Sequence, residues 1–144
     1  MQSFLFINMS YDYILDFWGK FRRKKSRFEV VETKAIGLIK QFVNGSINNK
    51  DFASSFEEVR IEFLKLMEVN GQITFDEDTP LWLNTFIGAH FIDWHKYQCI
   101  KKYFEEHPEE LVSKTKENFE RIQGQGYEER FQDACKAVLK GVKI

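Results

Sequence analysis

Residues 33–71 constrain the fold most, because they contain two amphipathic stretches that are separated and closed by Asn-Gly steps. In the second stretch, apolar side chains recur at spacings of four and three, which keeps them on one side of a helix with 3.6 residues per turn. These side chains are Phe52, Phe56, Val59, Phe63 and Leu66. The glutamates of the same stretch lie away from this stripe. The pattern predicts a helical hairpin with one face for a core and the other for water or a partner.

The remaining chain continues the helical pattern. Expected helices run over about 29–43, from 48 or 49 to 70, 80–104, 108–123 and 127–139, and Ser10 could cap an earlier one. Asn44-Gly45 and Asn70-Gly71 are expected to end the two hairpin helices, and Thr79-Pro80 to begin the next. Short connections favour an all-α, single-domain antiparallel bundle of five or six helices. We expect its core to contain Phe52, Phe56, Phe63, Phe86, Phe91 and Trp94.

A length of 144 residues suits one domain over residues 1–144, with an aromatic and basic N-terminal segment at 1–30 and the main bundle at 31–144. Cys99 and Cys135 lack CxxC spacing, which favours reduced thiols over a disulfide or a zinc site. Basic residues follow the apolar N-terminus, the reverse of a secretory signal, and acidic residues interrupt any spanning run. We therefore expect a cytoplasmic protein without a membrane span.

Charge is unevenly distributed along the chain. Residues 1–34 hold seven Lys or Arg against four Asp or Glu, whereas residues 48–110 hold six against thirteen. Such an acidic region attracts positively charged partners and repels the phosphates of nucleic acid. Solvated helix faces are also commonly charged, so each acidic residue taken singly fits a plain surface role as well.

The acidic run Asp76, Glu77 and Asp78 precedes Pro80 and has two interpretations. Carboxylates near a helix N-terminus are stabilised by the helix dipole, by about 0.3–1 kcal/mol each. Alternatively, the run forms an acidic site for the Lys and Arg of a partner. In that hypothesis Glu58, Glu62 and Trp82 complete the surface, with Trp82 as its apolar anchor.

Candidate catalytic residues are sparse. His90 and His95 lie about 140° apart around a helix, so they do not easily share a metal ion. The sequence has no GxGxxG, GxxxxGK[ST], GxSxG or HExxH motif. We expect a protein without enzymatic activity, cofactor or metal. An enzyme with a site built from His90, Asp93, Glu58 and Glu62 stays open as an alternative.

The hairpin carries a family resemblance in the run Phe42-Val43-Asn44-Gly45-Ser46-Ile47, followed by Phe52 and Phe56. Over residues 33–106 it resembles the small helical immunity proteins of the colicin D type and, more broadly, those of contact-dependent growth inhibition systems. The resemblance implies a protein that binds a toxin nuclease domain and covers its basic active-site cleft with an acidic surface. It does not extend to the N-terminal 30 residues.

The basic cluster at 20–27 supports a second hypothesis. Six of these eight residues are Lys or Arg, and Phe17, Trp18 and Phe21 could supply the apolar side of a membrane anchor. The alternative function is therefore a helical adaptor or regulator that contacts a membrane surface or a partner protein through this segment. Cations at a helix C-terminus are also favourable without any ligand.

Overall fold

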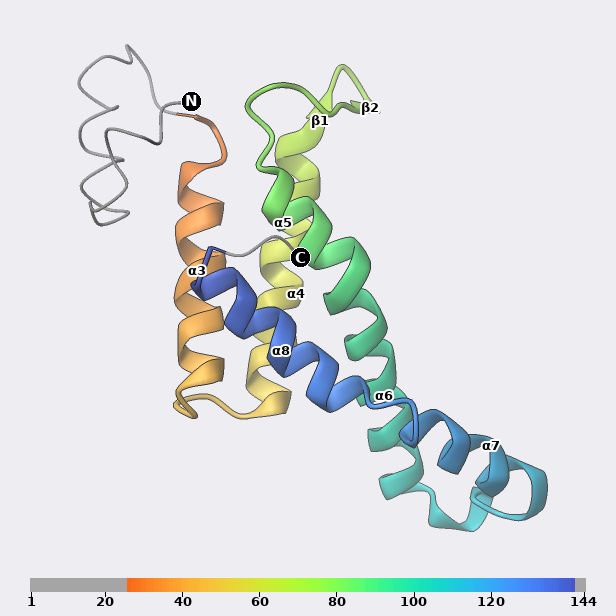
Figure 1. Ribbon diagram of the computed structural model, residues 1–144. Helices are drawn as coiled ribbons and strands as arrows, with labels where there is room; N and C mark the ends of the chain where they lie inside the picture. Colours follow the sequence, from red (N-terminus) through yellow and green to blue (C-terminus); the bar gives the residue numbers. More distant parts are fainter. Residues whose placement is uncertain (1–25, 142–144) are drawn as a thin grey trace.

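The computed structural model describes residues 26–141 and confirms the all-α prediction (Figure 1). The helix expected after Ser10 and the basic residues 20–25 lie outside the described residues. The α-helices are α3 Glu29–Val43, α4 Asn49–Met67, α5 Leu81–Phe86, α6 Ile92–Glu106, α7 Ser113–Gln123 and α8 Tyr127–Leu139. A π-helix, η1 Ile87–Phe91, joins α5 to α6, and a 3₁₀ turn, η2 Pro108–Glu110, precedes α7. Two-residue strands, β1 Glu68–Val69 and β2 Gln72–Ile73, complete the list.

Helices α3 and α4 form the predicted hairpin. Gly45, just beyond α3, has a φ of 83°, a left-handed conformation that glycine adopts without the steric cost of a Cβ. The side chain of Asn48 accepts a hydrogen bond of 2.7 Å from the amide of Asp51 and so caps α4. Both ends of this connection are therefore set by local residues, as the sequence predicts.

The second Asn-Gly step corrects the sequence prediction. Helix α4 ends at Met67, and Asn70 and Gly71 form the tight turn between β1 and β2 instead of ending the helix. Asn70 has a φ of 53° and Gly71 one of 79°. Positive φ at both central residues is the requirement of a type I′ hairpin turn, for which Asn-Gly is the preferred pair. The antiparallel register pairs Glu68 with Ile73.

Helices α5, η1 and α6 form one continuous rod, as the long apolar period predicts, although it begins at Leu81 with Pro80 as its N-cap. Phe86 and Phe91 are five positions apart, which in a regular α-helix would separate them by about 140°. Both are nevertheless completely buried, because the wider π turn between them restores their alignment.

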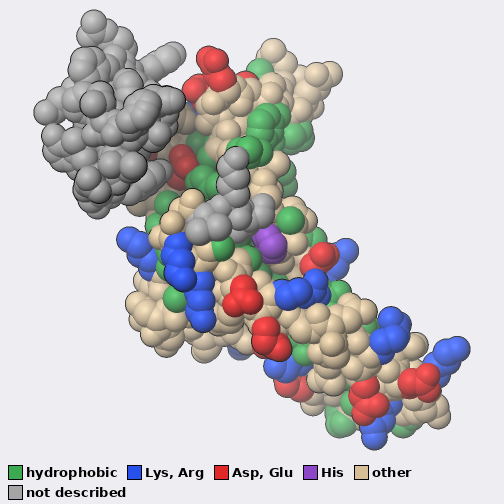
Figure 2. Space-filling model, viewed as in Figure 1, with side chains coloured by type: hydrophobic (Ala, Val, Ile, Leu, Met, Phe, Trp, Pro, Cys, Tyr) green, Lys and Arg blue, Asp and Glu red, His purple; other side chains and the backbone are tan. Residues whose placement is uncertain are grey.

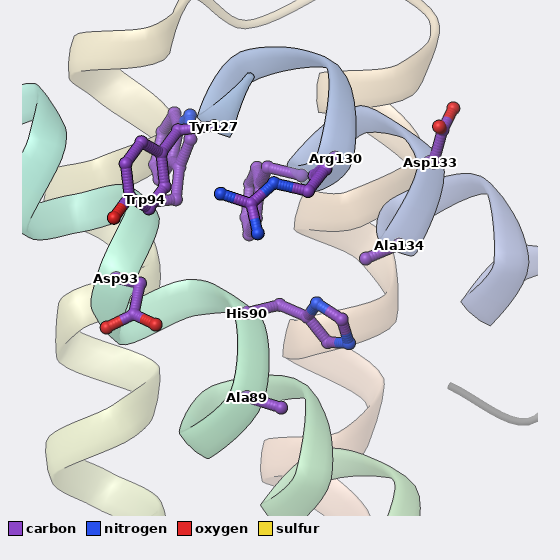
Figure 3. Close-up of a pocket in the computed structure, with 9 residues that line it drawn as sticks. Ala89, His90, Asp93, Trp94, Tyr127, Arg130, Asp133 and Ala134 are labelled. Atoms are coloured by element: carbon purple, nitrogen blue, oxygen red, sulfur yellow. The ribbon is translucent and has the colours of Figure 1, made fainter. Parts of the chain in front are cut away.

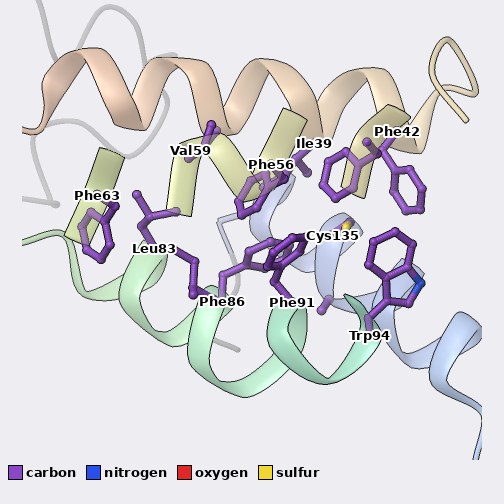
Figure 4. Packing of buried hydrophobic residues seen from close by; sticks show 14 of the residues in the cluster. Ile39, Phe42, Phe56, Val59, Phe63, Leu83, Phe86, Phe91, Trp94 and Cys135 are labelled. Atoms are coloured by element: carbon purple, nitrogen blue, oxygen red, sulfur yellow. The ribbon is translucent and has the colours of Figure 1, made fainter. Parts of the chain in front are cut away.

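Four helical rods, α3, α4, α5–η1–α6 and α8, build the core of the described chain, fewer than the five or six helices expected. The six predicted core residues are all buried in one cluster, which confirms that prediction (Figure 4). Phe131 of α8 lies at its centre, stacked on Trp94 with ring centroids 4.3 Å apart. It also contacts the rings of Phe42, Phe52, Phe86 and Phe91.

Helix α8 crosses the other rods obliquely and contacts α3, η1 and α6 (Figure 1). A polar contact fixes it in place: the carboxylate of Glu128 accepts hydrogen bonds from the indole of Trp94 at 2.8 Å and the amide of Gln98 at 2.6 Å. The side chain of Asn49 donates to the same carboxylate at 3.2 Å. Glu128 therefore links α8 to both α4 and α6.

Helix α7 lies outside this core. Pro108 begins only a 3₁₀ turn rather than the expected helix, and α7 starts five residues later at Ser113. Its one buried side chain, Phe119, packs on Phe104 of α6 with ring centroids 5.2 Å apart. Across residues 26–141, no helix combines the length and apolar character that a membrane crossing requires.

Candidate functional site

The acidic loop between β2 and α5 is shaped by the carboxylate of Asp76. This carboxylate accepts hydrogen bonds from the guanidinium of Arg27 at 3.0 Å, the amide of Asp78 at 2.9 Å and the hydroxyl of Thr79 at 3.3 Å. The same hydroxyl accepts a bond from the amide of Asp76, and Thr79 is buried. The hydrogen bond from Arg27 is the main cause that holds the pKa of Asp76 below its ordinary value of 3.8. Asp76 is thus a structural residue of the loop.

A pH prediction follows for Asp76. Because its pKa is lower in the folded chain, its ionised form contributes stability above the unfolded pKa, and this contribution is lost as the pH falls through the lower folded value. Asp76→Asn should therefore be less stable than wild type near pH 6, and the difference should shrink below pH 3.8. Urea unfolding at a series of pH values measures this difference. A difference that does not change with pH would contradict the role of the carboxylate.

Glu77 and Asp78, unlike Asp76, have no ion-pair partner among residues 26–141. Both are exposed, and no described cation lies within ion-pair distance of either carboxylate. Large apolar side chains stand exposed at the same end of the molecule: Ile73 is 60% exposed, Phe75 53% and Leu81 65%. We call Ile73, Phe75, Glu77, Asp78 and Leu81 the loop surface. Figure 2 shows acidic side chains with hydrophobic ones beside them at this end.

Trp82 is not part of this exposed surface. It is half-buried against the core, and its indole N–H donates a hydrogen bond of 2.8 Å to Glu32 of α3. Lys34 pairs with Glu62 at 3.1 Å, and Glu32 and Lys34 are about 200° apart around α3. The structure therefore places Trp82 and Glu62 on opposite flanks of α3. This position gives Trp82 a packing role, and its role as an apolar anchor stays a prediction.

Glu58 and Glu62 line a shallow groove of about 390 Å³ between α3 and α4. Leu38 and Val59 supply its apolar lining, and Lys34 and Gln41 line its α3 side. We call this the α3–α4 groove. The acidic character of the groove comes chiefly from Glu58, which is exposed and has no described cation within ion-pair distance.

Arg27 connects the end of α4 to the acidic loop. Its Nε donates to the backbone carbonyl of Leu66 at 2.9 Å, while its guanidinium pairs with Asp76. Leu66 lies in the last turn of α4, so Arg27 holds the loop at the end of this helix. Of the predicted residues, Asp76 is thus tied to the end of α4, whereas Glu58 and Glu62 line the groove and Trp82 donates to Glu32.

The residues of the enzymatic alternative do not converge. His90 and Asp93 line a pocket between η1–α6 and α8 (Figure 3), whereas Glu58 and Glu62 line the α3–α4 groove. No group of three or more His, Cys, Asp or Glu side chains within residues 26–141 has a metal-binding arrangement. The structure therefore contradicts a site assembled from these four residues.

Three residues of the loop surface, Ile73, Phe75 and Leu81, were not among the predicted residues. A signal was present, because all three are large apolar residues close to the acidic run. Comparisons of the chain with protein-family models, with curated proteins and with solved structures found no match.

Proposed function

We propose that this protein is an immunity protein that binds a basic toxin domain, with a nuclease as the expected toxin, and blocks its active-site cleft. The observation that carries the proposal is the loop surface, where three exposed apolar side chains stand beside two carboxylates without a described counterion. Apolar anchors surrounded by charged groups are a common composition of protein-binding hot spots.

Both the acidic and the apolar groups of the loop surface gain interactions when a basic partner binds. Glu77 and Asp78 form no ion pair with any residue of 26–141, so a cation of the partner adds attraction without loss of a described contact. Burial of Phe75 and Leu81 removes apolar surface from water. A nuclease cleft carries Lys and Arg that bind phosphates, and a carboxylate surface can occupy it in place of nucleic acid.

Two further features support the same function. The observed α3–α4 hairpin is the segment that carries the resemblance to helical immunity proteins. The α3–α4 groove offers a second acidic group on the same hairpin, the exposed carboxylate of Glu58. These groups would bind a partner through attraction of opposite charges and burial of apolar surface, and neither requires a catalytic step.

The test is the salt dependence of binding to a nuclease toxin domain, to be sought among the products of the genes next to this protein's own. We expect tight binding, with an association rate that falls roughly tenfold or more between about 50 and 500 mM salt, because screening weakens the attraction between acidic surface and basic cleft. Stopped-flow fluorescence measures this rate. A noncognate basic nuclease domain is the matched control. Stronger binding to RNA than to any basic protein domain would reverse the assignment.

A further inference from the structure

A second pocket, separate from the loop surface and the α3–α4 groove, lies between the π segment with the start of α6 on one side and α8 on the other (Figure 3). Its volume is about 350 Å³, within the range of small-molecule sites. The lining includes six side chains that carry a polar or charged group: His90, Asp93, Trp94, Tyr127, Arg130 and Asp133. The proposed immunity function uses none of them.

Arg130, an exposed residue of α8, supplies a positive charge that no described ion pair neutralises. No carboxylate of residues 26–141 forms an ion pair with its guanidinium, which lies 4.8 Å from the centroid of the Tyr127 ring. Tyr127 is stacked in turn on the buried Tyr97, with ring centroids 5.4 Å apart, so the guanidinium rests on a fixed platform. In Figure 3 the guanidinium lies in the middle of the pocket, and the carboxylate of Asp133 points away from it.

His90 adds a second polar group from the opposite wall. It belongs to the π segment, a distortion that is frequent at functional sites. Its ring forms no hydrogen bond with any described residue, and its ring centroid lies 6.2 Å from that of Phe86. Burial and, next, the charge of Arg130 lower the pKa of His90, against a smaller opposite effect of Asp93. The ring is therefore neutral near pH 7 and can donate one hydrogen bond.

We propose that this pocket binds a small monocarboxylate, with Arg130 as its ion-pair partner and His90 as a second hydrogen-bond donor. The planar guanidinium matches the two oxygens of a carboxylate. Asp93 and Asp133 line the pocket and repel a dianion such as phosphate more strongly than a single negative charge. The rings of Trp94 and Tyr127 and the methyl of Ala134 provide apolar lining for the body of the ligand.

The experiment is an NMR titration of the whole chain with sodium benzoate at constant ionic strength, observing the Arg130 Nε–H and His90 ring signals. We expect saturable shifts at both residues and at least about tenfold weaker binding by Arg130→Gln, since the charge-assisted pair is lost. Bound benzoate should also raise the pKa of His90, because an anion among Arg130, Asp93 and Asp133 favours the imidazolium.

Arg121→Gln is the matched control, because it removes the same charge from the exposed surface of α7 and should leave benzoate binding unchanged. Arg130→Lys keeps the charge but not the planar fork, and should bind benzoate with intermediate strength. Melting curves establish that each variant is folded. Benzoate shifts that do not saturate, or equal affinity in Arg130→Gln and wild type, would overturn the proposal. Tighter binding of inorganic phosphate than of benzoate would overturn the monocarboxylate assignment.

Discussion

Phe131→Ala should lower the free energy of unfolding by about 3–5 kcal/mol, the largest stability effect that we expect from a single substitution in this chain. The ring is 2% exposed and contacts five other aromatic rings, including the parallel stack on Trp94. Its removal leaves a cavity at the point where α8 meets the other three rods, and rigid aromatic neighbours fill such a space poorly. Urea unfolding followed by circular dichroism measures the change.

Phe56→Ala and Phe75→Ala give the matched comparison for this prediction. Phe56 is completely buried on α4 and should lose stability in the same range, because its ring also contacts several others. Phe75 is 53% exposed on the loop surface, and its truncation should change stability by no more than about 0.5 kcal/mol. Equal effects of Phe131→Ala and Phe75→Ala would show that the described core does not carry the fold.

The double substitution Glu77→Lys and Asp78→Lys should weaken toxin binding by about 100-fold or more while leaving the fold intact. Both carboxylates are exposed and unpaired within residues 26–141, so reversal breaks no described ion pair. In the proposed complex it places like charges against the basic cleft, which costs several kcal/mol. Calorimetric titration against the cognate toxin domain, together with survival of cells that express the toxin, measures the effect.

Asp76 is left out of this variant because its bonds to Arg27 and Thr79 shape the loop, and its reversal would change fold and charge together. The matched control reverses Glu117 and Glu120 on α7, which are equally exposed but far along the chain from the loop surface. It should bind as wild type does. If folded Glu77→Lys, Asp78→Lys protein still protects cells fully, the loop surface is not the toxin-binding site.

Local sequence determined the helices and the core. The stripe of Phe52, Phe56 and Phe63 places one face of α4 inside, because a period of 3.6 residues fixes which side chains share a side. Gly45 and Asn48 set the ends of the hairpin connection through their own backbone and side-chain preferences. Each of these effects acts within one or two turns of chain, which is why periodicity and capping residues predict them.

One local signal was ambiguous. Asn-Gly suits both the end of a helix and a type I′ turn, since each requires positive φ. At Asn44-Gly45 the helix-end interpretation is correct, whereas at Asn70-Gly71 the chain forms β1 and β2. The π segment at 87–91 is a comparable case, because simple helical periodicity does not predict that Phe86 and Phe91 both face the core.

The sequence by itself determined an all-α chain with a defined apolar core and an acidic region. Only the tertiary structure decided which acidic and aromatic residues are exposed and which have intramolecular partners. Asp76 is held by Arg27, 49 positions away, and Trp82 donates to Glu32, 50 positions away. Such partners meet only when α3, α4 and α5 have packed, and no spacing along the chain encodes them. Tertiary packing also decides which side chains are exposed, because burial depends on what the rest of the fold covers. It leaves exposed Phe75, Glu77, Asp78 and Leu81.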